Sequence, residues 1–598
     1  MNRNDKLIVA LLFLTLMGWL WYSNDAANKA RERALAERSA IGALSTNTAT
    51  TATLVQATNV PVIASTPLPD IVVQVPPTPT VHLLPEETNV LHSAEMDLMI
   101  SSRGATLRAA TLPAYRTRPE KNSGPVILDF DPQPALALSG LPDVPIDADY
   151  SVRSGSNNTL TLTFVTQHGL QVQRTIALRE YHQVVVTDRI TNTSEIPLKV
   201  GTNWVSLGTF YRGGSKNDEL SVDSFAIAPE NKVRHWSTVL PGLFGGGGAF
   251  ACPGQGRALQ DSVQQTTTGA QHWVALKSRF FVQAFAPSVA NTAFHFEAVR
   301  DTRKPAFALS HISGAVAFPG ALLAQNQSIE RSYQLYIGPK KLAYLTALGQ
   351  NRNEIMEFGF FSWFCKPLVP LLNFFYEHLV KNYGVAIILL TLLVRLVFWP
   401  LTHKSTESAK RMRDVQPKIK AVQEQFKDDP HKMQQEVWKI YRENKVNPFS
   451  SCLPMLVQLP VFIALYTVLR SAVELRFAPF LWVSDLSEPE NLFAGVFPFA
   501  INILPLVMAG VTIVQSKLTP AMGDPAQQKM MTWMMPLMML FFFYSMPAAL
   551  SLYWTVSTIL AIGQLWWQQR TPRAEVAAVD AATDPEKMTR QMRRRMER

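Results

Sequence analysis

An apolar run with a single arginine in it constrains this chain more than any other feature. The run extends from Gly384 to Thr402 (GVAIILLTLLVRLVFWPLT), close to the roughly 20 residues that a helix needs to cross a bilayer. Its one full charge is Arg395, and a guanidinium keeps its proton in proteins and is costly to place in hydrocarbon. From the run alone, two interpretations are open. Arg395 belongs to a functional site within the membrane, or its side chain reaches the headgroups near Lys404.

The rest of the chain divides between membrane and water. Of its 598 residues 47% are hydrophobic, but long apolar segments occur at Leu7–Tyr22 and then from Phe358 onward. This distribution is typical of a membrane protein with one large water-exposed domain. The three cysteines, at positions 252, 365 and 452, are too few and too widely spaced for a CxxC zinc site or a disulfide framework.

The first apolar segment is predicted to be an uncleaved signal anchor, residues 1–24, with the N-terminus in the cytoplasm. Arg3 and Lys6 precede it, and Trp19-Leu20-Trp21-Tyr22 ends it as an interfacial aromatic belt rather than a small-residue cleavage site. A cleaved secretory signal is the alternative. Residues 25–87, rich in Thr, Ala, Val and Pro, are predicted to form a flexible linker.

Residues 88–349 are predicted to form an antiparallel β-sandwich. The segments that alternate apolar and polar residues are Thr159–Gln167, Val172–Leu178, Gln183–Asn192, Phe280–Ala286, Phe294–Val299 and Ser328–Ile337. The histidines at 235, 272, 295 and 311 are scattered without metal-ligand spacing, so we expect no metal, no cofactor and no catalysis here. A sugar-binding or sugar-modifying sandwich with a pair of acids is the alternative.

Two amphipathic segments flank the apolar run. Phe358–Leu379 is aromatic throughout and contains Pro367 and Pro370, which favours a helix lying in the membrane interface, residues 358–379. Thr402–Asn447 is basic and has an apolar stripe at helical spacing. It is predicted to be a cytoplasmic hairpin of two helices, residues 402–447, broken near Asp429-Pro430; the alternative is a solvated charged loop.

Four further spans complete a topology with six transmembrane helices. They are predicted at Pro448–Ala472, Leu492–Ser516, Gln528–Ser545 and Ala548–Gln568. The acidic loop Glu474–Asn491 suits the outside, while the basic tail, residues 571–598, suits the cytoplasm together with the N-terminus. Residues 384–570 thus form a core of five helices.

At this point the chain resembles the YidC-type membrane protein insertases, in their Gram-negative form. The residues that carry the resemblance are TLLVRLVFWPLT, AKRMRDVQPKIKAVQEQF, the segment Lys445–Ser487, DPAQQKMMTWMMPLMM and LSLYWTVST. It covers residues 358–570 by motif and the large β-domain by architecture. It implies a multi-pass protein of the bacterial inner membrane with a periplasmic sandwich.

The resemblance implies an insertase and chaperone, not an enzyme, with a hydrophilic groove open to cytoplasm and lipid. The groove residues implied are Arg395, Thr391, Gln458, Tyr553 and Trp554, and the hydrophobic slide residues are Leu459, Phe462, Phe542 and Met546. Trp554 stands where relatives often carry a tyrosine, so it lacks the hydroxyl of that residue, and Met546 stands at a position that is aromatic in some relatives. For the slide residues, the alternative role is simple packing between helices. Polar residues within the spans can instead form interhelical hydrogen bonds; these residues are Gln458, Asn502 and Gln515.

The implied partners are nascent membrane proteins, lipid and the Sec translocon. Ribosome or signal recognition particle contact is a further expectation, because the tail ends MRRRMER and a basic run attracts RNA or anionic lipid by charge. A transporter or channel for small polar solutes is the alternative from another class. Inverted repeats would favour it, and the five core spans show none.

Overall fold

The computed structural model describes residues 85–120, 122–155, 158–211, 219–227, 231–236, 262–300, 309–426, 429–444, 453–493, 500–518 and 525–570. The predicted anchor at 1–24, nearly all of the linker at 25–87, two of the three cysteines and the tail at 571–598 lie outside these ranges.

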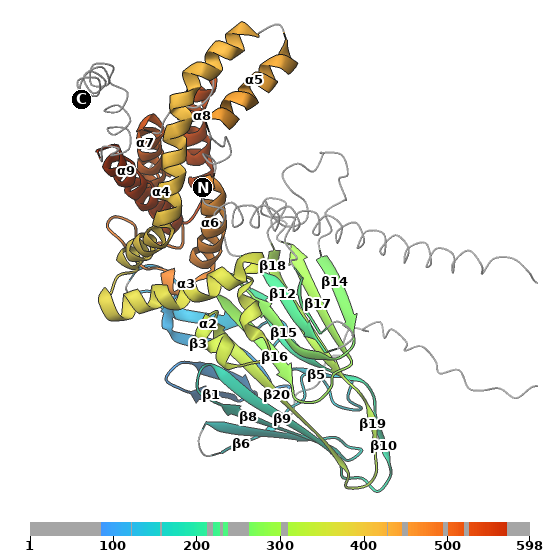
Figure 1. Cartoon of the computed structure of the whole chain (residues 1–598). Coiled ribbons are helices and arrows are strands. Elements are labelled where there is room, and N and C mark those ends of the chain that lie inside the picture. Colours follow the sequence, from blue (N-terminus) through green and yellow to red (C-terminus); the bar gives the residue numbers. More distant parts are fainter. Residues whose placement is uncertain are drawn as a thin grey trace, which may run out of the picture. The chain divides into compact units, whose positions relative to one another are not determined.

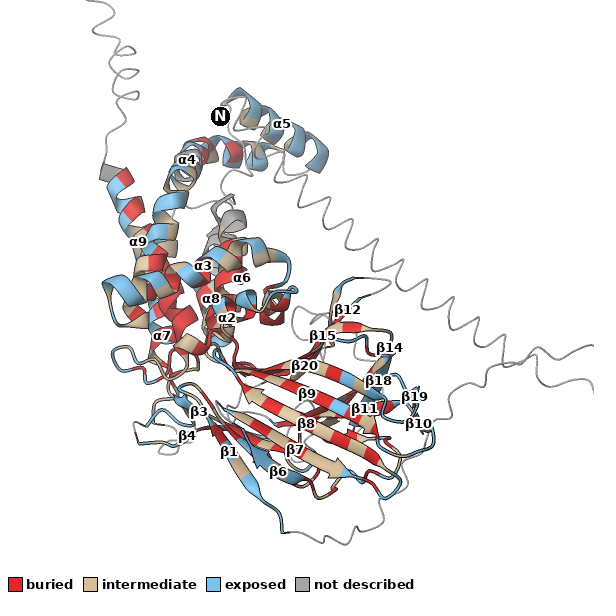
Figure 2. Ribbon diagram, turned by 90° about the horizontal axis from the view of Figure 1, so that it is seen from below, coloured by how far each residue is buried: buried red, intermediate tan, exposed pale blue. Residues whose placement is uncertain are grey.

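A nine-stranded antiparallel sheet forms the larger layer of the β-domain, in the order β13-β12-β15-β16-β20-β9-β8-β7-β6. Its strands alternate as the sequence pattern predicts: along β8, Leu170–Leu178, every second residue is buried, which Figure 2 shows as red interrupted by tan. In register, Thr175 of β8 lies opposite Thr187 of β9. The bounds are β6 Ser151–Ser154, β7 Thr159–Val165, β9 Gln183–Asn192, β12 Ser221–Ala226, β13 Val233–Trp236, β15 Gln271–Lys277, β16 Phe281–Pro287 and β20 Ser328–Pro339.

A five-stranded sheet, in the order β14-β17-β18-β11-β5, packs against the larger one. Phe285 of β16 and Phe294 of β17 are both fully buried in the shared core. Every strand pairing in the described domain is antiparallel, so the predicted β-rich fold is confirmed. The bounds are β5 Leu138–Ser139, β11 Asn203–Tyr211, β14 Ser262–Thr268, β17 Ala293–Arg300 and β18 Leu309–Phe318.

Two smaller sheets complete the domain. One has the order β1-β2-β3-β4, with bounds Thr88–His92, Asp97–Ser101, Thr106–Arg116 and Pro125–Asp129; the other pairs β10, Leu198–Val200, with β19, Ala321–Leu323.

The C-terminal part is helical (Figure 1). Its α-helices are α2 Leu342–Ala347, α3 Ser362–Phe374, α4 Tyr383–Gln425, α5 Pro430–Glu443, α6 Leu453–Ser471, α7 Ile503–Leu518, α8 Pro525–Phe543 and α9 Ala548–Arg570. Within the described ranges, the segments 383–403 and 548–568 are long and apolar enough to cross a membrane, and shorter apolar helices cover 503–518 and 532–543. The helical part is therefore established, and the count of six spans stays a prediction.

The helix with Arg395 does not end at Thr402. It continues to Gln425 as one helix of 43 residues despite Pro400 and Pro417, so the first arm of the hairpin is an extension of the span (Figure 1). The break comes at Asp429, whose side chain accepts a hydrogen bond from Lys432 N at 3.0 Å and caps α5. The arms pack through the apolar stripe, with Met412, Val415 and Ile419 buried against Val437, Ile440 and Tyr441.

The span predicted from Leu492 was wrong at its first residues. Leu492 instead forms an isolated bridge with Ile501, and α7 begins only at Ile503. The reason is a helix cap, because the Glu490 carboxylate accepts hydrogen bonds from the backbone nitrogens of Ile503, at 3.0 Å, and Leu504, at 2.5 Å. A carboxylate at this position satisfies free N–H groups and the helix dipole.

Candidate functional site

A small cavity lies where α4, α6 and α9 meet. Its volume is about 10 Å³, close to what one water molecule needs. It is lined by Thr391, Val394, Arg395, Phe398, Thr402, Gln458, Val461, Tyr553 and Ser557. Four of the five residues predicted for the groove are thus brought together, and Trp554 is not among them.

Arg395 enters the cavity from α4. Its Nε donates a hydrogen bond to Ser557 Oγ of α9 at 3.0 Å. No carboxylate in the described part of the chain lies within ion-pair distance of the guanidinium. A cation among polar hydroxyls, rather than beside a protein carboxylate, keeps its charge available to a ligand.

Gln458 and Tyr553 close the cavity between α6 and α9. Gln458 Nε2 donates to Tyr553 Oη at 2.6 Å, so the interhelical hydrogen bond expected as an alternative for Gln458 exists within the cavity wall itself. Tyr553 is 2% exposed. These two side chains therefore both line the cavity and join its walls.

Thr391 and Thr402 extend the polar face of α4 on either side of Arg395. Thr391 Oγ1 donates to its own helix, at Ile387 O, 2.6 Å away. Thr402 Oγ1 lies 3.1 Å from Gln564 Nε2. Asn502, by contrast, holds loops together, because it binds Asn491 N at 2.7 Å and Tyr544 O at 2.6 Å.

Sequence reasoning missed Ser557, the direct partner of Arg395, as well as Val394, Phe398, Thr402 and Val461. A signal was available for two of them. Ser557 lies four residues after Tyr553 and Thr402 lies seven after Arg395, spacings that place each pair on one helix face.

Trp554 belongs to an aromatic cluster instead of the cavity. Its ring centroid lies 5.4 Å from that of Phe462 and 5.4 Å from that of Phe543. Of the predicted slide residues, Leu459 is 54% exposed and Phe542 41% exposed, while Phe462 and Met546 pack against the buried helical core. The slide residues are thus divided between exposed and packed positions.

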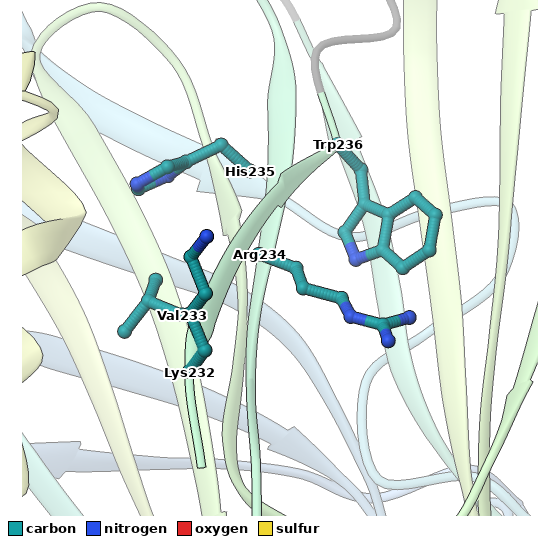
Figure 3. A pocket seen from close by; sticks show the side chains of 5 residues that line it. All are labelled: Lys232, Val233, Arg234, His235 and Trp236. Carbon is teal, nitrogen blue, oxygen red and sulfur yellow. The ribbon is translucent and has the colours of Figure 1, made fainter. Parts of the chain in front are cut away.

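The β-domain contains a separate cluster of charges at β13. A hollow of about 400 Å³ lies against this strand. Figure 3 shows the side chains of Arg234 and Trp236 on one side of the strand and that of His235 on the other side. His235 Nδ1 lies 3.0 Å from Asp223 Oδ1 and 3.2 Å from Glu357 Oε1.

These three groups are close enough to be metal ligands, but Lys277 already lies between the two carboxylates. Its Nζ pairs with Asp223 and lies 3.1 Å from Glu357 Oε1. Two carboxylates, a lysine and a protonated histidine balance in charge, so the residues fit an ion network better than a metal centre.

The contacts within this cluster shift the pKa values of His235 and Glu357. Burial opposes the charged form of His235, but hydrogen bonds to Asp223 and Glu357 outweigh it and raise the pKa of His235 to about 9. Burial likewise opposes ionisation of Glu357, yet Lys277 and His235 hold the pKa of that carboxyl well below its usual range.

Two protein-family models match the chain, one described as "60Kd inner membrane protein" over residues 374–575 and one as "YidC periplasmic domain" over residues 90–226 and 255–371. A relative named membrane protein insertase YidC, from Pelobacter propionicus, is 32% identical over 482 residues, which cover 77% of this chain and 83% of the relative. Another, from Syntrophobacter fumaroxidans, is 40% identical over 303 residues, which cover 50% of this chain and 53% of the relative. The chain spans about half the length of several such relatives.

Among solved structures, "Active YidC insertase crystal structure with the first transmembrane domain resolved" is 19% identical and covers 82% of this chain and 94% of its own. Its TM-score is 0.32.

Proposed function

Because the chain belongs to the YidC family, we propose that it inserts integral membrane proteins into the bacterial inner membrane and helps them fold. It acts on nascent membrane proteins alone or beside the Sec translocon, and the ribosome or signal recognition particle delivers some of them. The relatives that carry the name membrane protein insertase support this proposal.

The proposed groove consists of Arg395, Thr391, Gln458 and Tyr553, together with Ser557. The observation that carries it is the guanidinium of Arg395, which binds Ser557 Oγ at 3.0 Å within the cavity between α4, α6 and α9, although the segment of α4 around it is apolar. A polar or acidic segment of a client gains charge-assisted hydrogen bonds there, which lower the cost of leaving water. Burial of the client's apolar segment in lipid then drives insertion without a nucleotide.

The proposed topology has six transmembrane helices, five of them in the core at residues 384–570. Both termini and the hairpin at 402–447 face the cytoplasm, the β-domain at 88–349 faces the periplasm, and residues 358–379 lie in the membrane interface. What supports the last assignment is that α3 buries Cys365 and Leu368 while Trp363 is 68% exposed. Leu459 and Phe462 of α6, with Phe542 and Met546, form the slide, and Trp554 supports it through its contact with Phe462.

Insertion of a short single-span client into liposomes that contain only this purified protein tests the proposal, with protease protection as the readout. Two clients are compared, one with acidic residues in its outer segment and one with those residues neutralised. We expect Arg395→Ala to reduce protection of the acidic client about tenfold, which corresponds to roughly 1.4 kcal/mol, and to affect the neutral client less. Arg395→Lys retains much of the activity, because a point charge is what the site supplies.

Equal losses with Lys and Ala would contradict the point-charge account. If the folded wild-type chain gives no protection, the proposal of autonomous insertion is wrong. That outcome would favour an accessory role beside Sec or a transporter of small polar solutes.

A further inference from the structure

The cavity at Arg395 is too small for the client segment that the proposed function requires. Its volume is about 10 Å³, which is room for about one water molecule. A client helix with its side chains has a diameter of about 10 Å and does not fit into that space. At least one of the three helices around it must therefore move, and the contacts of α4, α6 and α9 differ enough to identify which one.

The interface between α4 and α9, called the α4–α9 seam below, has side-chain contacts at several positions along the two helices. Arg395 binds Ser557 at 3.0 Å, Thr402 binds Gln564 at 3.1 Å, and the rings of Trp399 and Trp567 lie 5.8 Å apart. Between the described side chains of α6 and α9, by comparison, the hydrogen bond is the single one from Gln458 to Tyr553, and the rings of Phe462 and Trp554 lie 5.4 Å apart. Because Phe462 follows Pro460, the hydrogen bond from Gln458 is the tie to α9 on the N-terminal side of this proline.

The described side chains of α6 differ in burial on the two sides of position 460. In its C-terminal half, Val461, Ala464, Leu465, Val468 and Leu469 are all buried. Ala464 O accepts a contact from Cys365 Sγ at 3.7 Å, and Arg470 O accepts a hydrogen bond from Arg279 Nε at 2.7 Å. On the N-terminal side, Leu459 is 54% exposed.

Pro460 lies at the boundary between the fixed and the exposed part of α6. A proline inside a helix removes one backbone hydrogen bond and favours a bend at that point. We propose that the N-terminal end of α6 swings about Pro460 to open the cavity to a client segment, and that the hydrogen bond between Gln458 and Tyr553 is the latch that this motion breaks. The proposal rests on the proposed insertase function.

Opening the latch also prepares the site chemically. The Gln458 amide N–H and the Tyr553 oxygen, which are bonded to each other in the closed state, become available to polar groups of the client beside Arg395. Those new hydrogen bonds offset the one that is broken, so the open state is favoured when a polar segment is present and the closed state when it is absent.

The test ties α6 to α9 covalently and reversibly. In a chain whose native cysteines are replaced by serine, Gln458→Cys and Tyr553→Cys are joined with short bis-methanethiosulfonate linkers, and insertion is measured in liposomes before and after reduction. The matched control joins Trp399→Cys to Trp567→Cys on the α4–α9 seam; neither of these residues lines the cavity. We expect the α6–α9 tie to reduce insertion at least tenfold relative to the same double-cysteine protein before it is joined, and reduction to return insertion to that level. The control tie changes insertion of its own double-cysteine protein less than twofold.

Equal insertion by the tied and the reduced α6–α9 protein overturns the latch. If the wild-type chain itself inserts no client, the proposed function fails before the latch is reached. Should the reduced double-cysteine protein be inactive, Pro460→Ala decides, because it restores the backbone hydrogen bond outside the cavity. We expect a several-fold slower insertion with an unchanged or higher Tm, and an unchanged insertion rate overturns the hinge.

Discussion

Arg279 Nη1 lies 2.5 Å from Glu488 Oε1, in an ion pair whose side chains are 5% and 20% exposed. The same guanidinium donates to Ser487 O at 2.5 Å and to Arg470 O at 2.7 Å. The turn between β15 and β16 is thereby joined to the end of α6 and to the loop before α7. Because Glu488 O also accepts from Ala548 N at 2.9 Å, one arginine of the β-domain contacts the segment that caps α9.

We expect Glu488→Gln to destabilise the protein by about 3 kcal/mol, because it removes the carboxylate charge that pairs with a buried guanidinium. The measurement is denaturation of the full chain in detergent micelles. A double-mutant cycle with Arg279→Met provides the control. If the pair is coupled as the geometry indicates, the double variant loses less than the sum of the two single variants; strict additivity would contradict it.

A second buried pair, inside the β-domain, offers a comparison along one strand. Arg174 and Asp188 are paired through Nε–Oδ1 at 2.7 Å and Nη2–Oδ2 at 2.8 Å, with side chains 0% and 2% exposed. We expect Asp188→Asn to cost about 3 to 5 kcal/mol of stability. The matched control is Glu330→Gln. This substitution removes the ion pair between Glu330 and Arg189, the neighbour of Asp188, and both side chains of that pair are more than half exposed. It should lower the free energy of unfolding by less than about 1 kcal/mol. Similar losses for both variants would contradict this account.

Ser557→Ala tests the orientation of Arg395. Without the hydroxyl that accepts from Nε, the guanidinium loses one anchor, and we expect insertion of the acidic client to fall about fivefold, the equivalent of about 1 kcal/mol. Ser557→Thr keeps the hydroxyl and should retain most of the activity. An alanine variant as active as the wild type would mean that Arg395 needs no such anchor.

The sequence predicted what depends on local pattern. Alternation located β7, β8, β9 and β20 nearly to the residue, because a sheet with one buried face requires period two. Likewise, Thr391 and Arg395 share a face because four residues make about one helical turn. The role of the cavity residues stays a proposal, but their convergence on one cavity follows from these spacings and the packing of three helices.

What could not be predicted depends on contacts distant in sequence. Neither the pairing of Arg279 with Glu488, 209 residues apart, nor the neighbour order of β16, β20 and β9 leaves a periodic signal. The start of α7 was misplaced because its cap, Glu490, lies 13 residues before Ile503 and resembles any loop acid. Trp554 was assigned to the groove by analogy, whereas its neighbours in space, Phe462 and Phe543, decide its place.

The last prediction concerns pH and the cluster at His235. Because hydrogen bonds to Asp223 and Glu357 outweigh burial and raise the pKa of His235 to about 9, above its ordinary value of about 6.5, the folded state binds the proton more tightly than the unfolded state. The stabilisation is therefore fully present below about pH 6.5 and is lost as the pH rises through about 9. The imidazole is 37% exposed, so solvent screening reduces the effect to about 1 kcal/mol. We expect the wild-type Tm to fall between pH 6.5 and 9 by more than that of His235→Gln, measured in the same buffers. Parallel curves for the two proteins would show that the proton on His235 does not stabilise the fold.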